Sequence, residues 1–106
     1  MPKYLLEVNY TLDGIRGLKS AGGSARLAAA KELIEGVGGK MEAFYFAFGG
    51  TDVYAIADLP DSSSAAAAAL TVSAGGGATV RTVVLLTPAE MDEAAARQTT
   101  YRPPGS

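Results

Sequence analysis

Apolar and polar residues alternate along several short segments of the chain with the period of two that is typical of β-strands. The pattern predicts four strands, over residues 3–11, 40–48, 52–59 and 78–86. In the first strand, one face carries Tyr4, Leu6, Val8 and Tyr10, and the other carries Leu5, Glu7 and Asn9. The connection Gly49-Gly50-Thr51 between the second and third strands is typical of a tight hairpin.

The second predicted strand is apolar on both of its faces. One face carries Phe44, Phe46 and Phe48, and the other carries Met41, Ala43, Tyr45 and Ala47. An antiparallel sheet that leaves one face to water alternates between apolar and polar residues instead. We therefore expect both faces of this sheet to be covered.

Four helices are predicted between and after these strands, and each begins or ends at a recognisable capping residue. A short helix over 12–18 follows Thr11 as N-cap, and a full helix over 24–37 begins at Ser24 and ends at Gly38-Gly39. The next helix has Asp61 as N-cap, contains the alanine run 65–69 and ends at the glycines 75–77. The last begins with the capping box Thr87-Pro88-Ala89-Glu90 and extends to about residue 98.

This order of elements, β-α-β-β-α-β followed by a C-terminal helix, predicts a single α+β domain of the split βαβ type over residues 1–98, with a proline-containing tail over 99–106. The two long helices would cover one face of the sheet. The small side chains of Ala65–Ala69 suggest close packing on the face that carries Ala55 and Ala57. Tyr54 and the three phenylalanines would then face a second copy of the chain, so a homodimer or a higher homo-oligomer is expected.

Composition removes several classes of function. Nine basic against eleven acidic residues give a net charge of −2 with no basic stripe, so we expect no nucleic-acid partner. The absence of cysteine excludes a thiol nucleophile, and the absence of histidine removes the commonest general base and metal ligand. We expect neither a metal nor a cofactor. The N-terminus does not resemble a signal peptide and the apolar runs are too short to cross a bilayer. A cytoplasmic protein without a membrane partner is expected.

The chain resembles the GYD-domain family. The residues that carry the resemblance are Tyr10-Thr11, Gly14-Ile15-Arg16, Leu18, Gly38-Gly39-Lys40, Phe44-Tyr45, Phe48-Gly49, Asp52, Pro60-Asp61 and Arg81-Thr82 with Leu86-Thr87. The triplet Gly50-Thr51-Asp52 has threonine where the family name implies tyrosine, so no role of that tyrosine passes to Thr51. The resemblance implies a ferredoxin-like βαββαβ antiparallel sheet, with two main helices on one face and a short C-terminal helix, whose sheets pack as a dimeric α/β barrel.

Polar residues on two predicted strands form the first candidate ligand site. Glu7 and Asn9 share one strand face, and Arg81 lies on a strand that is expected to be its neighbour. Together they would make a polar floor for a small ligand. The alternative is an ion pair at the sheet rim or in a subunit interface.

Asp52 and the aromatic residues form the second group of candidates. Asp52 follows the hairpin glycines and would act as a base or bind a ligand donor, or else accept hydrogen bonds from turn amides. Tyr10 and Tyr54 belong to a dense aromatic set that would shape a pocket for a planar ring, or else pack in the core and interface. No catalytic residue is assigned.

Two functions remain open at this point. The first is a self-associating module that binds a small molecule or simply assembles. The second is a cofactor-independent enzyme, such as a monooxygenase or isomerase acting on a small, possibly aromatic compound. The second rests on analogy with the fold, and it would place proton transfer on Asp52, Glu7, Asp58 or a tyrosine.

Overall fold

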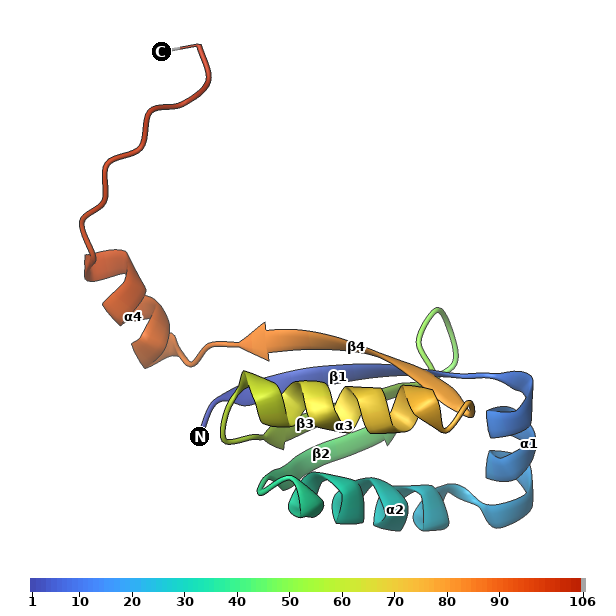
Figure 1. The fold of residues 1–106 in the computed structure, drawn as a ribbon. Helices are drawn as coiled ribbons and strands as arrows, with labels where there is room; N and C mark the ends of the chain where they lie inside the picture. The colour runs from blue at the N-terminus through green and yellow to red at the C-terminus, as the bar shows by residue number, and fades with distance from the viewer. Residues whose placement is uncertain (106) are drawn as a thin grey trace.

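The computed structural model describes residues 1–105, so Ser106, the end of the predicted tail, lies outside the described residues. The fold is mixed α+β, with one four-stranded sheet and four helices (Figure 1). In chain order the elements are β1 (Lys3–Tyr10), α1 (Leu12–Ala21), α2 (Gly23–Gly36), β2 (Lys40–Phe46), β3 (Val53–Asp58), α3 (Ser62–Ala74), β4 (Ala78–Leu85) and α4 (Pro88–Ala96).

The sheet is open and fully antiparallel, with strand order β2-β3-β1-β4. The first strand therefore lies inside the sheet, where it pairs with β3 on one side and β4 on the other. In this register Leu5 lies opposite Ile56 and Val83, while Glu7 lies opposite Tyr54 and Arg81. The residues of each such row point to the same face.

Helices α2 and α3 both lie against one face of the sheet (Figure 1). The core between these layers includes Tyr4 and Leu6 of β1, Ile34 of α2 and the small residues of β3 and α3, namely Ala55, Ala57, Ala65 and Ala68. The predicted close packing of alanine on alanine is therefore confirmed. Alanine carries no side chain beyond Cβ, so the α3 backbone can approach the sheet closely.

The prediction for the phenylalanines was wrong. Phe44 lies opposite Ala55 and Phe46 opposite Val53, which places both on the helix-covered face, and the Phe46 ring lies against Gly23 of α2. A bulge between Met41 and Ala43 and a connection that is longer than a tight hairpin set this register. Phe48 lies in that connection, fully exposed.

The helix starts are largely as predicted. Thr11 and Asp61 accept hydrogen bonds from the amides of Gly14 and Ser64, and the Thr87–Glu90 capping box is formed in both directions. Ser24 is not the cap of α2. Helix α1 continues to Ala21, and Gly22, with φ of 89°, makes the corner and serves as N-cap without a side-chain bond.

Helix α4 and the tail behind it stand apart from the body of the domain (Figure 1). All residues of α4 are exposed, including Met91, and the residues after it up to 105 are exposed as well. Across residues 1–105, no helix combines the length and apolar character that a bilayer crossing requires.

Candidate functional site

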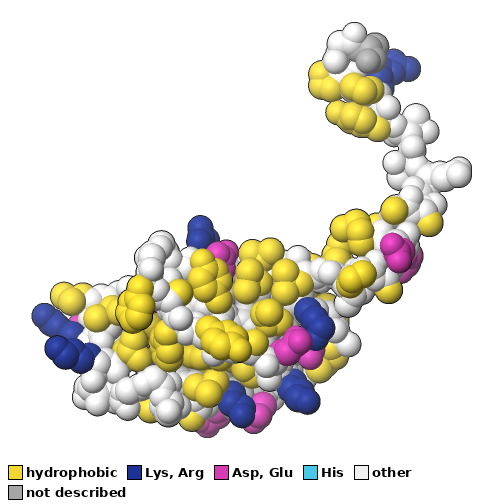
Figure 2. Space-filling view, turned by 180° about the vertical axis from the view of Figure 1, so that it is seen from behind, with side chains coloured by type: hydrophobic (Ala, Val, Ile, Leu, Met, Phe, Trp, Pro, Cys, Tyr) yellow, Lys and Arg dark blue, Asp and Glu magenta, His cyan; other side chains and the backbone are white. Residues whose placement is uncertain are grey.

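The sheet face that helices α2 and α3 leave bare, here called the open face, carries four of the six candidate residues. Its apolar members are Leu5, Ala43, Tyr45, Tyr54, Ile56, Val83 and Leu85. The view from behind in Figure 2 shows apolar side chains gathered across the middle of the molecule, with charged side chains toward its margins. The open face is therefore an apolar surface with a polar border.

The predicted proximity of Glu7 and Arg81 is confirmed. The Glu7 Oε1 and Arg81 Nη2 atoms lie 3.6 Å apart on adjacent strands. The Arg81 side chain is 71% exposed and Glu7 is 21% exposed, so water screens the pair. An exposed ion pair of this kind contributes at most about 1 kcal/mol. This geometry agrees with the ion-pair alternative.

Asn9 and Asp52 are engaged in fastening the β2–β3 connection to the end of β1. The Asn9 side chain donates to the Gly50 carbonyl at 3.1 Å and accepts from the Asp52 amide at 3.2 Å. The Asp52 carboxylate accepts the Tyr10 amide at 2.8 Å. The structural interpretation of Asp52 holds, although the amide that it binds belongs to β1 rather than to the turn.

The two tyrosines lie on opposite sides of the sheet. Tyr54 lies on the open face beside Tyr45 and Glu7, with 41% of its surface exposed. Tyr10 follows the alternation of β1 and points to the helix side. The six candidates therefore do not converge on one site.

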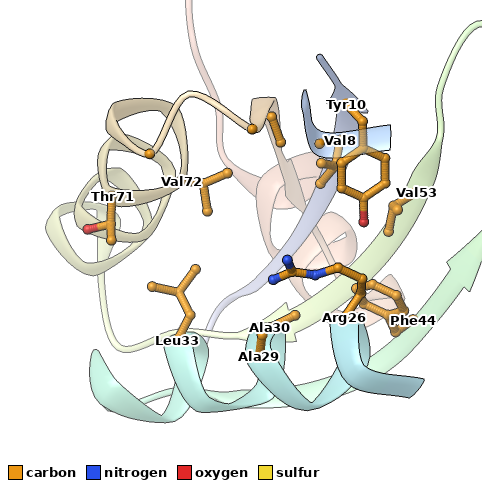
Figure 3. Close-up of a pocket in the computed structure, with 14 residues that line it drawn as sticks. Val8, Tyr10, Arg26, Ala29, Ala30, Leu33, Phe44, Val53, Thr71 and Val72 are labelled. Atoms are coloured by element: carbon orange, nitrogen blue, oxygen red, sulfur yellow. The ribbon is translucent and has the colours of Figure 1, made fainter. Parts of the chain in front are cut away.

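A cavity of about 330 Å³ lies on the helix side, between α2, α3 and the ends of the strands (Figure 3). We call it the helix-side cavity. The residues that line it are Val8, Tyr10, Gly14, Arg26, Ala29, Ala30, Leu33, Phe44, Val53, Thr71, Val72, Gly75, Gly77 and Ala78. Its size is at the lower end of the range for small-molecule sites.

Arg26 and Tyr10 supply the polar chemistry of this cavity. Figure 3 shows the Arg26 side chain reaching into it from α2, with the Tyr10 ring pointing toward it from the strand. Burial raises the pKa of the Tyr10 hydroxyl; the Arg26 charge opposes this rise and Asp52 adds to it. The phenol therefore stays protonated at neutral pH and can donate a hydrogen bond.

A second, smaller apolar space of about 60 Å³ lies next to the helix-side cavity. The two spaces share the wall residues Val8, Ala30, Leu33, Phe44 and Val72. The smaller one is also lined by Leu6, Ile34, Met41, Ala55, Ala68, Ala69 and Val80. All of these side chains are apolar. The space available to a ligand is thus polar at the Arg26 end and apolar along its length.

Arg26 was not among the predicted site residues, although the sequence contains a signal for it. Arg26, Ala29, Ala30 and Leu33 recur at the helical spacing of one face, and Leu27 and Ile34 continue the apolar side of the helix. An arginine that continues the buried side of a helix is a candidate for a site beneath that helix. Within residues 1–105 the structure contains no cluster of three potential metal-ligating side chains.

Comparison with known proteins gives one result. The GYD domain family matches residues 4–95 of the 106-residue chain. No curated protein and no solved structure matches the chain. The match begins at the second residue of β1, includes the other three strands and the helices between them, and extends nearly to the end of α4. The chain therefore belongs to the GYD domain family.

Proposed function

We propose that this protein is a self-associating module that binds a small molecule in the helix-side cavity. In this proposal the fold is of the ferredoxin-like type, and two copies pack their open faces together as a dimeric α/β barrel. One observation carries the proposal: the open face presents an apolar surface, while the cavity lies on the other side of the same sheet. Pairing through the open face therefore leaves the cavity accessible.

The apolar rows of the open face favour its burial. Leu5, Ile56 and Val83 lie in one row across three strands, and Tyr45 and Tyr54 are neighbours in the next. Tyr45 is 71% exposed in the single chain, and Val83 is 39% exposed. Each Å² of such surface removed from water contributes about 25 cal/mol.

Two groups of charges at the border of this face form ion pairs within one chain. Lys3 Nζ lies 2.7 Å from Glu42 and 3.0 Å from Asp58, and Arg81 pairs with Glu7. A charge that keeps its partner costs less to bury than an isolated one. The border of the open face is thus compatible with partial burial in an interface.

The size of the open face also suggests a role for α4. Four strands of this length span roughly 20 by 24 Å, or about 500 Å² on each chain. Stable interfaces bury about 800 Å² on each partner. In the proposed dimer, the exposed apolar side chains of Leu86 and Met91 would pack on the other copy and supply the missing area.

Sedimentation velocity at micromolar concentration tests the assembly. The unsubstituted chain is expected to sediment as a dimer, and Ile56→Lys, which places a charge at the centre of the open face, as a monomer. Leu70→Lys is the matched control, because Leu70 is 70% exposed on α3, on the opposite side of the sheet. A monomeric unsubstituted chain, or an equal effect of both substitutions, would contradict the proposal.

No observation favours the enzyme alternative as a second function. Among the described residues, no carboxylate lines the helix-side cavity. Of the groups considered for proton transfer, only Tyr10 borders the cavity, and its pKa is shifted upward, away from that of a base at neutral pH. The expected cytoplasmic location stays a prediction.

A further inference from the structure

We propose that the ligand of the helix-side cavity is an apolar monocarboxylate, with its carboxylate on Arg26 and its hydrocarbon body lying between α2 and α3. This inference rests on the proposed function, since it specifies the ligand of the same cavity. Three observations support it: the charge on the wall, the neighbouring hydroxyl and the shape of the apolar space.

Arg26 is the charged residue of the cavity wall and lacks an internal partner. Within residues 1–105 it forms no ion pair; the pairs that exist involve Lys3, Arg81 and Arg97. The side chain is partly buried among Ala29, Ala30 and other apolar groups. A cation in such surroundings has lost part of its hydration, and a bound anion replaces the lost interactions with water. The planar guanidinium matches a carboxylate with two parallel hydrogen bonds.

Tyr10 adds a second donor at the same end of the cavity. Its hydroxyl points toward the Arg26 side chain in Figure 3. A carboxylate lying against the guanidinium would receive this hydrogen bond as well. Thr71 does not add to this donor set, because its hydroxyl already donates to the Ala67 carbonyl at 2.8 Å.

The apolar part of the cavity wall indicates that the other end of the ligand is a hydrocarbon. Beyond Arg26 and Tyr10, the side chains that line the adjacent smaller space are apolar, from Leu33 and Val72 to Ala68. A hydrocarbon chain fits a cavity bordered by a small apolar space of about 60 Å³ better than a broad ring does. A ligand with one carboxylate at one end and a hydrocarbon chain over the rest of its length is a short to medium-length fatty acid.

Isothermal titration calorimetry with octanoate tests the inference, and octan-1-ol and octylammonium serve as probes of the same length. Octanoate is expected to bind at least tenfold more tightly than octan-1-ol, and octylammonium more weakly than either. From butanoate to octanoate the affinity should rise about fourfold for each methylene, the factor that burial of a CH₂ gives. Equal affinity for octanoate and octan-1-ol would overturn the carboxylate assignment.

Variants locate the charge recognition. Arg26→Met keeps an unbranched apolar stem and removes the guanidinium, so the preference for octanoate over octan-1-ol should disappear. Arg26→Lys should keep a reduced preference, and Tyr10→Phe should weaken octanoate binding several-fold. Lys31→Met is the matched control, because Lys31 is an exposed lysine of the same helix and does not line the cavity.

The outcomes separate this inference from the proposal on which it rests. If octan-1-ol binds as well as octanoate, or if Arg26→Met leaves the preference unchanged, the cavity is a binding site for another class of ligand. If none of the probes binds at millimolar concentration, the assignment of an apolar monocarboxylate fails, while the self-association in the proposed function is unaffected. Self-association is measured independently by sedimentation. If Arg26→Met does not fold, the probe series on the unsubstituted chain and Arg26→Lys still decides.

Discussion

Gly14 lies where two backbone segments meet, and its replacement by alanine is predicted to destabilise the protein. A Cβ atom at this position would lie 1.9 Å from the Gly77 carbonyl oxygen and 2.9 Å from its carbon. Both neighbours are backbone atoms, so no side-chain rotation relieves the overlap. The same carbonyl accepts the Thr11 amide at 3.0 Å, and the Thr11 hydroxyl donates to the Gly76 carbonyl at 2.9 Å.

The size of the effect follows from what must move. The oxygen has to retreat from 1.9 Å to at least 3.0 Å, which strains or breaks the two hydrogen bonds made by Thr11. Their loss costs about 1 kcal/mol each, and overpacking of this kind costs about 1–3 kcal/mol. The gain of up to about 1 kcal/mol from alanine in a helix offsets only part of this. We expect a net loss of roughly 2 kcal/mol, or about 8–16 °C in Tm.

The assay is urea denaturation at a fixed protein concentration, because self-association would couple stability to concentration. Gly17→Ala is the control within α1, since a Cβ there meets no atom within 4 Å. It should stabilise the protein by about 0.5–1 kcal/mol, which is the opposite sign. If Gly14→Ala is as stable as the unsubstituted chain, the close approach of α1 to the glycines after α3 is not present in solution.

Further predictions concern another glycine and the cap of α4. Gly39→Ala should lower the free energy of unfolding by about 1–3 kcal/mol in the same urea titration, because its Cβ would lie 2.5 Å from the Asp58 carbonyl oxygen. Gly36→Ala, where a Cβ meets open space, should cause no measurable loss of stability. Thr87→Ala should weaken α4 by about 1 kcal/mol, seen as faster amide exchange confined to that helix. The hydrogen bond from the Thr87 amide lowers the pKa of Glu90. The ionised Glu90 carboxylate therefore stabilises α4 fully above pH 4.5, and this stabilisation is lost as the pH falls through the lowered pKa. Helix content that is unchanged in acid would refute this.

The order of elements could be predicted from the sequence because each boundary is marked locally. Thr11, Asp61 and the Thr87–Glu90 pair act within one helical turn, so their roles do not depend on the rest of the fold. The alternation of β1 likewise assigns its two faces correctly. Ser24 failed as a cap because the neighbouring Gly22 adopts a positive φ and starts the helix earlier.

The face of Phe44 and Phe46 could not be predicted, because it depends on strand register. Both faces of β2 are apolar, so hydrophobicity does not choose between them, and the bulge near Met41 is not marked in the sequence. The candidate site failed for a related reason: Tyr10 and Tyr54 were grouped as pocket-forming aromatics, although the register places them on opposite sides of the sheet. Arg26 was not predicted as a site residue because the cavity that it lines depends on the distance between α2 and α3. No local sequence pattern gives that distance.

The outstretched α4 makes this chain larger than its length suggests. Its radius of gyration is 16.8 Å, whereas a compact domain of this length has about 13 Å. Small-angle X-ray scattering would register that difference directly. A fluorescent label or affinity tag attached behind the last helix would also sit well away from the ligand space, so it should not obstruct entry to that space.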